Sequence, residues 1–363
     1  MFGGIYQGRR VLVTGHTGFK GSWLSLWLTE LGASVTGYSD RVPTVPAHFD
    51  VLGLAAKMDH HLGDVRDRAN LTRVFAEAQP EIVFHLAAQP IVRVSYAEPA
   101  ATFETNVMGT VNVLEAARQT PSVKAVVLIT SDKCYRNVEW VWGYRETDAL
   151  GGHDPYSGSK GAAELAAFAY YHSFFNRPDA AAMATARAGN VIGGGDWAPD
   201  RIVPDCVRAW AQGQTVPVRS PKATRPWQHV LEPLSGYLVL GAALWRRQPA
   251  ANGSAYNFGP DAVVTQSVGE LIDALAARWP GAAAEFQSAD TSRPEAHLLR
   301  LSCDKALAEL RWRAVLSFDE CVEMTGDWYR EYYQTPAASA ARSIAQVREY
   351  QVRAAARGLE WAR

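Results

Sequence analysis

The stretch Arg10-Val11-Leu12-Val13-Thr14-Gly15-His16-Thr17-Gly18-Phe19-Lys20-Gly21 decides the fold class of this chain. Its first five residues form an apolar run typical of a buried strand, and the glycines that follow are spaced Gly-x-x-Gly-x-x-Gly. Apolar residues between Leu24 and Leu31 predict a helix after this turn. Such a turn lets the backbone approach a pyrophosphate, which the first amides of the helix stabilise. We therefore expect contacts to a dinucleotide from Gly15, Thr17, Gly18, Phe19, Lys20 and Gly21.

A second strand, predicted over residues 33–38, should end near the adenosine ribose of the dinucleotide. Asp40 there suits the ribose hydroxyls of NAD, whereas Arg41 suits the 2′-phosphate of NADP. We favour NAD, with NADP as the alternative. Asp64 is a candidate for the adenine side, although it could equally cap a helix. The remaining candidates for cofactor contacts are Val65, Leu86, Ala87 and Ala88.

Apolar strands alternate with amphipathic helices through the first half of the chain. This order predicts an α/β fold with a Rossmann-type, doubly wound parallel sheet. Beyond about residue 180, turns with glycine and proline separate shorter elements, which we interpret as a smaller C-terminal mixed α/β substrate lobe. The predicted domains are residues 1–185 for the cofactor, 186–335 mainly for the substrate, and 336–363 as a helical tail on the body or on a partner subunit.

Composition is typical of an enzyme with a large core: 363 residues, 48% of them hydrophobic, with a formal net charge of -1. The sequence has no basic block for nucleic acid, no apolar run of membrane-spanning length and no signal-peptide pattern. We therefore expect a cytoplasmic protein without nucleic-acid or membrane partners. The four cysteines lack metal-ligand spacing, so we expect free thiols and no metal site: Cys134, Cys206, Cys303 and Cys321.

The segment Asp154-Pro155-Tyr156-Ser157-Gly158-Ser159-Lys160 predicts a base that removes an alcohol proton. Asp154 suits an N-cap and Pro155 the first helical position, which places Tyr156 and Lys160 on one face of a helix. Lowering a phenol pKa from ~10 to near ~7 needs roughly 4 kcal/mol, about what one cation ~4 Å away supplies at an effective dielectric of ~20. Taken alone, the pair is more often a surface tyrosine and a helical lysine.

Three polar residues follow the strand predicted over residues 124–130 and should reach the same cleft as Tyr156. Ser131 suits a hydrogen bond to a substrate oxygen, and Asp132 suits proton transfer. Lys133 suits deprotonation of a carbon acid if its ammonium is neutralised. Any one of the three could be an ordinary turn residue.

Arginines stand in proline-containing loops of the predicted substrate lobe, after a glycine-rich loop at residues 188–197 that could approach a ligand closely. Planar guanidinium groups suit a diphosphate. Read singly, each is more often a surface or ion-pair residue. These arginines are Arg201, Arg225 and Arg293.

The combination of motifs resembles the extended short-chain dehydrogenase/reductases, from about Arg10 to Trp328. The resemblance rests on Gly15, Gly18, Gly21, Tyr156, Lys160 and Arg187-Ala188-Gly189-Asn190-Val191. Within that group, three longer strings resemble CDP-glucose 4,6-dehydratases. They are Thr14-Gly15-His16-Thr17-Gly18-Phe19-Lys20-Gly21-Ser22-Trp23, Thr130-Ser131-Asp132-Lys133-Cys134-Tyr135 and Arg225-Pro226-Trp227-Gln228-His229-Val230.

The resemblance implies an NAD-dependent hydro-lyase that converts CDP-D-glucose to CDP-4-keto-6-deoxy-D-glucose, in deoxysugar biosynthesis for lipopolysaccharide O-antigen. Carbon 4 is oxidised, water leaves across carbons 5 and 6, and hydride returns to carbon 6. In this scheme Tyr156 deprotonates the carbon-4 hydroxyl, and Lys160 lowers the pKa of Tyr156 and holds the nicotinamide ribose. Ser131 hydrogen-bonds the same oxygen, and Asp132 protonates the departing hydroxyl.

Lys133 departs from the pattern of the related dTDP-glucose dehydratases, which carry a glutamate at this position. A lysine can take the carbon-5 proton only if desolvation or a neighbouring cation lowers its pKa. Lys160 and an oxidised nicotinamide are candidate neighbours for that effect. Otherwise Lys133 would stabilise the enolate while another group moves the proton.

The resemblance also implies contacts to the nucleotide sugar from Asn190, Arg201, Arg225 and Arg293. It implies a homodimer in which helices near residues 102–118 and 156–174 pair as a four-helix bundle, the alternative being a monomer. The rival functions are a nucleotide-sugar epimerase, a dehydratase acting on another nucleoside-diphosphate hexose and, more remotely, a non-catalytic nucleotide sensor. An epimerase would need no Asp132-Lys133 pair.

Overall fold

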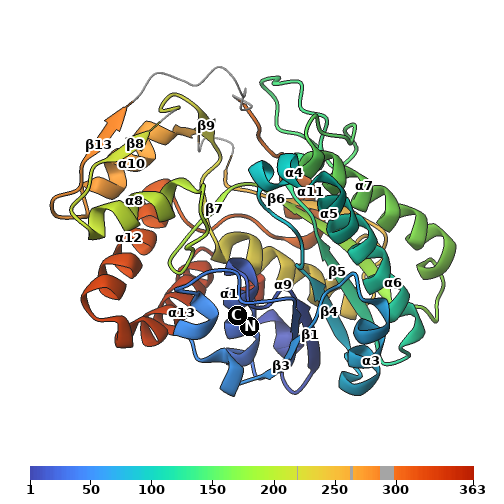
Figure 1. The fold of residues 1–363 in the computed structure, drawn as a ribbon. Helices are drawn as coiled ribbons and strands as arrows, with labels where there is room; N and C mark the ends of the chain where they lie inside the picture. Colours follow the sequence, from blue (N-terminus) through green and yellow to red (C-terminus); the bar gives the residue numbers. More distant parts are fainter. Residues whose placement is uncertain (219, 262–264, 287–297) are drawn as a thin grey trace.

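Seven parallel strands form the central sheet of the computed structural model, which describes residues 1–218, 220–261, 265–286 and 298–363 (Figure 1). The order β11-β6-β5-β4-β1-β2-β3 reverses direction between β1 and β4, which is where a doubly wound sheet opens a crevice at its carboxyl edge. The predicted fold class is therefore confirmed. The strands are β1 (Arg10–Thr14), β2 (Ser34–Ser39), β3 (Asp59–Leu62), β4 (Ile82–His85), β5 (Ala125–Ile129), β6 (Ala182–Ala188) and β11 (Ala255–Phe258).

Strand side chains are buried on both faces of the sheet, because helices cover both. In β1, Val11 and Val13 point into one apolar cluster and Leu12 into the other. In β5, Val126 and Val127 divide in the same way. This two-residue alternation between two buried faces explains why the strands read as continuous apolar runs.

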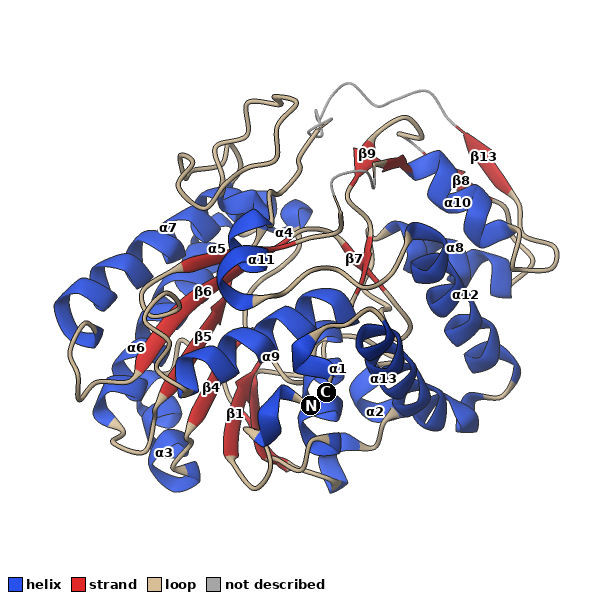
Figure 2. Cartoon of the chain, turned by 180° about the vertical axis from the view of Figure 1, so that it is seen from behind, coloured by secondary structure: helices blue, strands red, loops and turns tan. Residues whose placement is uncertain are grey.

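The helices form one layer on each face (Figures 1 and 2). α3, α6 and α7 cover one face, while α1 and α9 cover the other and carry α12 and α13 outside them. The helices are α1 (Phe19–Glu30), α2 (His48–Val51), α3 (Arg68–Ala78), α4 (Val92–Ala97), α5 (Pro99–Phe103), α6 (Gly109–Gln119), α7 (Pro155–Tyr170), α8 (Ile202–Ala211), α9 (Leu231–Trp245), α10 (Val268–Ala276), α11 (Asp304–Leu310), α12 (Phe318–Gln334) and α13 (Ser339–Ala356).

A smaller lobe of α8, α10 and short strand pairs lies above the carboxyl edge of the sheet (Figure 1). Its pairs are β7 (Val191–Ile192) with β10 (Gln228–His229), β8 (Val216–Val218) with β13 (Ala284–Phe286), and β9 (Thr224–Arg225) with β12 (Gln266–Ser267). The chain returns from this lobe to the sheet through α9 and β11. The division at residues 185 and 186 thus stays a prediction about which stretch mainly binds the substrate.

The C-terminal tail packs on the body as α13, which contacts α1 and α12. The two termini meet on this side, where the Met1 amine donates to the Arg363 carbonyl at 2.7 Å (Figure 2). Among the described helices, none is both long and apolar enough to cross a membrane.

Candidate active site

The glycine turn between β1 and α1 is packed too tightly for side chains. Gly15 has a φ of +76°, and a Cβ placed there would lie 2.7 Å from the Ala87 nitrogen. A Cβ on Gly21 would lie 2.0 Å from the Gly15 carbonyl oxygen. The turn therefore closes against the end of β4 and leaves the first amides of α1 at the crevice. A dinucleotide pyrophosphate fits this cradle.

Ser39, at the end of β2, holds the turn from the adenosine side. Its hydroxyl lies 2.8 Å from Nδ1 of His16 and accepts the Thr17 amide at 3.4 Å. Thr17 also donates from its hydroxyl to the Arg41 carbonyl at 2.6 Å. Asp40 is exposed and 3.7 Å from the Arg41 guanidinium. Asp40, which suits NAD, and Arg41, which suits NADP, therefore both lie beside the glycine turn.

Asp64 and Val65 lie at the next strand end along the sheet, after β3. The Asp64 carboxylate accepts from the Arg66 guanidinium at 2.6 Å, and this hydrogen bond lowers its pKa. Val65 is buried. The alternative reading of Asp64 as a helix cap is wrong, because Asp67 caps α3 by accepting the Asn70 amide at 3.1 Å.

The helix α7 starts as its sequence predicts. Asp154 accepts the Ser157 amide at 2.9 Å and Pro155 is the first helical residue. Tyr156 and Lys160 follow, one turn apart and both buried. Tyr156 and Lys160 are therefore not surface side chains, and both point inward.

Ser131 joins the two candidate proton-transfer groups. It is hydrogen-bonded to the Tyr156 phenol, and its hydroxyl donates to Oδ1 of Asp132 at 3.0 Å. The second carboxylate oxygen, Oδ2, is buried and has no hydrogen-bond partner among the described residues. A buried carboxylate oxygen without a partner is costly in a protein interior, so this atom is suited to meeting a substrate group.

Burial, not the lysine charge, dominates the titration of Tyr156 in the protein by itself. Burial raises the pKa of Tyr156 to about 12, while the Ser131 hydrogen bond and the charge of Arg201 act in the opposite direction. Burial also lowers the pKa of Lys160 to about 8. The low pKa expected for Tyr156 is thus not found in the protein by itself, because desolvation of the phenolate outweighs the Ser131 hydrogen bond and the charge of Arg201.

The glycine-rich segment after β6 meets the same site. A Cβ on Gly189 would lie 3.0 Å from Oδ2 of Asp132, so a glycine leaves room for that carboxylate. Asn190 follows and is half-buried, as is Lys133 on the 3-10 turn Asp132–Cys134.

The predicted substrate arginines differ in their surroundings. Arg201 precedes α8, forms an ion pair with Asp196 at 2.7 Å and influences the Tyr156 phenol. Arg225 lies in β9 and donates to the Thr224 carbonyl at 2.8 Å. Arg293 lies outside the described residues. The structure therefore brings Arg201 to the candidate catalytic groups and places Arg225 in the lobe above them.

Sequence reasoning missed a buried ion pair directly behind the catalytic groups. Glu164, one turn beyond Lys160 on α7, receives two hydrogen bonds from Arg187 of β6, at 2.9 and 2.8 Å. Arg187 also donates to the Tyr135 hydroxyl at 2.8 Å. The available signal was the four-residue spacing of Tyr156, Lys160 and Glu164 on one helix face.

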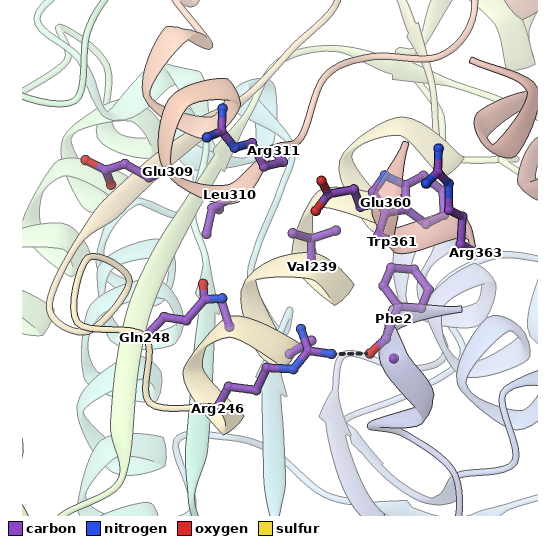
Figure 3. Close-up of a pocket in the computed structure, with 13 residues that line it drawn as sticks. Phe2, Val239, Arg246, Gln248, Glu309, Leu310, Arg311, Glu360, Trp361 and Arg363 are labelled. Atoms are coloured by element: carbon purple, nitrogen blue, oxygen red, sulfur yellow. Dashed lines mark hydrogen bonds between the residues drawn. The ribbon is translucent and has the colours of Figure 1, made fainter. Parts of the chain in front are cut away.

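A cavity of about 310 Å³ lies near the chain termini and is lined by none of the candidate cofactor, catalytic or substrate residues (Figure 3). The Arg246 guanidinium donates there to the Phe2 carbonyl at 3.0 Å. Within the described ranges, no cluster of three or more His, Cys, Asp or Glu side chains could hold a metal ion. The candidate catalytic groups are instead gathered at the carboxyl edge of the sheet.

A sequence model of the GDP-mannose 4,6-dehydratase family matches residues 12–325. The chain belongs to this family. Its similarity to the CDP-glucose 4,6-dehydratase of Salmonella typhimurium (strain LT2) is 50% identity over 332 residues, which cover 90% of this chain and 92% of that relative. The resemblance to nucleotide-sugar 4,6-dehydratases is thus confirmed.

More distant family relatives agree with this assignment. The dTDP-glucose 4,6-dehydratase of Xanthomonas campestris pv. campestris (strain B100) is 27% identical over 344 residues, covering 88% of this chain and 92% of that relative. The solved structure of MoeE5 in complex with UDP-glucose and NAD has a TM-score of 0.73 and 26% identity, over 88% of this chain and 98% of that one. The chain therefore matches these relatives over most of its length.

Proposed function

We propose that the protein is a CDP-glucose 4,6-dehydratase, an NAD-dependent hydro-lyase that forms CDP-4-keto-6-deoxy-D-glucose. The 50% identity to a CDP-glucose 4,6-dehydratase over 90% of the chain supports this substrate. In the geometry, the observation that carries the function is the buried, unpartnered Oδ2 of Asp132 beside the Ser131 and Tyr156 pair. An epimerase requires the tyrosine but no such acid.

NAD would be held by the glycine turn, with Ser39 and Asp40 toward the adenosine and Tyr156 and Lys160 toward the nicotinamide ribose. When bound, it supplies the redox chemistry, taking two electrons and a hydrogen from carbon 4 and returning them to carbon 6. The tight approach of Gly15 to Ala87 supports this placement. NAD in the related MoeE5 complex also supports it.

Tyr156 would take the proton of the carbon-4 hydroxyl, and Ser131 would hold the same oxygen. Oxidation must come first, because the carbon-5 hydrogen becomes acidic only beside a ketone. Asp132 would then protonate the departing carbon-6 hydroxyl through its free Oδ2. Because Ser131 is hydrogen-bonded to both Tyr156 and Asp132, one hydroxyl would orient both proton-transfer groups.

Lys133 is our proposed partner for carbon 5, either as the base or as the cation that stabilises the enolate. Exchange of the carbon-5 hydrogen with solvent deuterium distinguishes these two roles. If Lys133 is the base, Lys133→Met should oxidise carbon 4 yet fail to exchange the carbon-5 hydrogen with deuterium from D2O. If it only stabilises the enolate, exchange should continue at a reduced rate.

The remaining substrate contacts are proposed for Asn190, Arg201, Arg225 and Arg293, in the lobe of residues 186–335. Arg201 is already neutralised by Asp196, so a diphosphate would compete with that carboxylate or share the arginine with it. Arg201→Lys should raise KM for the nucleotide sugar more than it lowers kcat, since a lysine lacks the bidentate geometry.

A homodimer through a four-helix bundle is proposed from the outer face of α5 to α7. Large apolar side chains stand exposed there, including Leu165 at 59% and Phe168 at 63% of their full accessibility. Phe103 and Met108 on the neighbouring segment are exposed as well. A second copy of this face would cover them.

Cytoplasmic location and a role in O-antigen deoxysugar supply stay proposals. The substrate of the similar CDP-glucose 4,6-dehydratase, a nucleotide sugar, supports a biosynthetic role. Cell fractionation would test the location, and loss of deoxysugar from the lipopolysaccharide of a deletion strain would test the role.

The deciding experiment is incubation with CDP-, dTDP- and GDP-glucose, followed by detection of a ketone by its absorbance in alkali. We expect ketone from CDP-glucose well ahead of the other two. Asp132→Asn should still oxidise carbon 4 but form little dehydrated product. Formation of another hexose without ketone would identify an epimerase instead, and preference for dTDP- or GDP-glucose would overturn the substrate assignment.

A further inference from the structure

His85 is the last residue of β4, and its imidazole is buried at the carboxyl edge of the sheet, where the strand order reverses. The neighbouring strand there is β1, in which Thr14 lies opposite His85 in the register (Figure 1). Both ring nitrogens have a hydroxyl partner: Nδ1 lies 2.7 Å from Oγ1 of Thr14, and Nε2 lies 3.1 Å from Oγ1 of Thr110 in α6. The ring therefore bridges β1 and the helix that covers this face of the sheet.

The partners of the two hydroxyls determine the direction of every hydrogen bond in this bridge. Thr110 donates its hydroxyl proton to the Asn106 carbonyl at 2.7 Å, so its oxygen accepts from Nε2–H of His85. Nδ1 is then the acceptor of a neutral imidazole and takes the Thr14 hydroxyl proton. The Thr14 oxygen in turn accepts the Ala87 amide at 3.2 Å. Burial agrees with a neutral ring, since it lowers the pKa of His85 to about 3.

Asn106 forms the far end of the bridge, in the π-helical turn Glu104–Met108 that precedes α6. Its buried side chain accepts the Gln89 amide at 2.8 Å, donates to the Gln89 carbonyl at 3.2 Å and donates to Oγ of Ser159 at 2.8 Å. Ser159 itself donates to the Tyr156 carbonyl at 2.7 Å. One amide side chain thus holds together the segment after β4 and the first turns of α7.

These contacts form one continuous path between the two halves of the proposed reaction. At one end lies the backbone of residues 86–88, which the sequence predicts to contact the cofactor. At the other end lies the helix that carries Tyr156 and Lys160. Every link in the path is a hydrogen bond of 3.2 Å or less. The imidazole is the rigid member of this path, because its two nitrogens stand at a fixed separation.

We propose that His85 is a further positioning residue of the reaction, which fixes the cofactor-binding end of β4 relative to the helix of Tyr156 and Lys160 and does not itself transfer protons. The inference deepens the proposed function and rests on it. Oxidation at carbon 4 sends a hydride to the cofactor and a proton to Tyr156, so both acceptors must lie in contact with one C–O unit. A misplacement of ~1 Å in such a geometry costs on the order of 10²-fold in rate.

Three variants separate the two halves of the bridge. His85→Phe keeps a planar ring and removes both nitrogens. His85→Asn places an amide near the position of Nδ1 and keeps only the contact to Thr14. His85→Gln reaches the position of Nε2 and keeps only the contact to Thr110. Circular dichroism and urea unfolding verify the fold of each variant before the kinetic comparison.

His48→Phe is the matched control for the loss of a buried histidine. Like His85, His48 is buried and has two hydroxyl partners, Oγ of Ser22 at 2.9 Å and Oγ of Ser343 at 3.0 Å. It stacks on Trp23 of α1, in the layer on the other face of the sheet. The control therefore removes the same kind of side chain without touching the bridge.

The kinetic readout is a split between kcat and KM. His85→Phe should lower kcat for CDP-glucose by about 10²-fold and change KM by less than about twofold, because the bridge contains none of the proposed substrate residues. With deuterium at carbon 4, the isotope effect on kcat should rise, because hydride transfer would then limit turnover. His85→Asn and His85→Gln should lie between His85→Phe and the wild type. His48→Phe should retain the wild-type kcat.

Hydrogen exchange of the protein without cofactor gives a readout that does not depend on turnover. In His85→Phe, amides of residues 86–91 and of residues 156–160 should both exchange faster, whereas His48→Phe should change neither segment. The ratio of wild-type kcat to that of His85→Phe should also stay constant between pH ~6 and ~9, because a neutral ring binds and releases no proton there. Lys160, the charged group that faces His85, is shared by both proteins.

The outcomes distinguish this inference from the function on which it rests. Wild-type kcat in His85→Phe would overturn it, and so would faster exchange confined to residues 86–91. A kcat ratio that follows a pKa near ~6.5 would show that His85 transfers protons itself, which also contradicts the proposal. If the wild-type protein formed no ketone from any of the three nucleotide sugars, the proposed function would fail, while the exchange measurement would still decide whether His85 joins the two segments.

Discussion

The two helical layers on the central sheet differ in what lies outside them. The layer of α1 and α9 is covered by the C-terminal tail, in which Val347 and Tyr350 of α13 are buried. The layer of α5 to α7 has no such cover in the described chain, and Leu165 and Phe168 stand exposed. The chain therefore completes one layer by itself and leaves the other apolar, as expected if a second copy completes it.

The layers also differ in how they hold a buried glutamate. In α7, burial alone would raise the pKa of Glu164, but the charge and hydrogen bonds of Arg187 bring it below its usual value. In α9, Glu232 accepts the Val315 and Leu316 amides and the Tyr350 hydroxyl, and burial raises its pKa to about 7. Ionisation of Glu164 therefore stabilises the α7 layer, whereas ionisation of Glu232 destabilises the α9 layer.

The largest expected effect is a loss of turnover on changing Tyr156, in the buried first turn of α7. Tyr156→Phe should lower turnover by roughly 10²–10⁴-fold, because the carbon-4 hydroxyl loses its base. Binding of NAD, followed by calorimetry, should be nearly unchanged. Tyr170→Phe, on the outer end of the same helix, is the matched control and should retain turnover. Equal activity of the two variants would exclude Tyr156 from catalysis.

Glu164→Leu should cost about 3–5 kcal/mol of unfolding free energy, since it leaves the buried Arg187 guanidinium without its carboxylate. Urea unfolding followed by circular dichroism measures this. The double variant Glu164→Leu/Arg187→Met should recover part of the loss, because no buried charge is then left unpaired. A loss below about 1 kcal/mol in the single variant would show that water screens the Glu164–Arg187 ion pair in spite of its burial.

Glu232 should make the α9 layer less stable as pH rises. Its folded pKa of about 7 lies above the ordinary 4.5, so its contribution is complete below pH ~4.5 and is lost as pH rises through 7. The difference between these two pKa values corresponds to roughly 3 kcal/mol of unfolding free energy. Glu232→Gln should flatten the dependence of unfolding free energy on pH between 5 and 8. Glu77→Gln, on the surface of α3, should leave it as in the wild type; an unchanged slope in Glu232→Gln would contradict the assignment.

Changes on the outer surfaces of the two helical layers should have the smallest effect on stability. They nevertheless decide whether a second copy of the chain covers α5 to α7. Phe168→Asp should convert a dimer to a monomer in sedimentation velocity, because the charge would be buried at the proposed bundle. Val352→Asp, equally exposed on α13, should leave the oligomeric state unchanged. Either change should alter monomer stability by less than about 0.5 kcal/mol. A wild-type monomer, or a dimer that survives Phe168→Asp, would remove the basis for the four-helix bundle.

Local sequence patterns predicted several of the elements and the doubly wound, parallel class of the sheet. The run Arg10–Thr14 is β1 as its apolar residues predict, and a capping box of Ser317 and Glu320 starts α12. The cap Asp154 and the first-position Pro155 likewise set the start of α7. These signals are readable because strand alternation, glycine turns and helix caps depend on residues close together in the sequence.

Tertiary structure alone decided which side chains meet and what burial does to them. Lys20 reaches Tyr237 across 217 positions, and Glu232 meets Tyr350 across 118. The spacing of Tyr156 and Lys160 predicted their shared face but not that burial would raise the phenol pKa to about 12. Desolvation depends on every element packed around a group, and those contacts are set by the fold of the whole chain rather than by neighbouring residues.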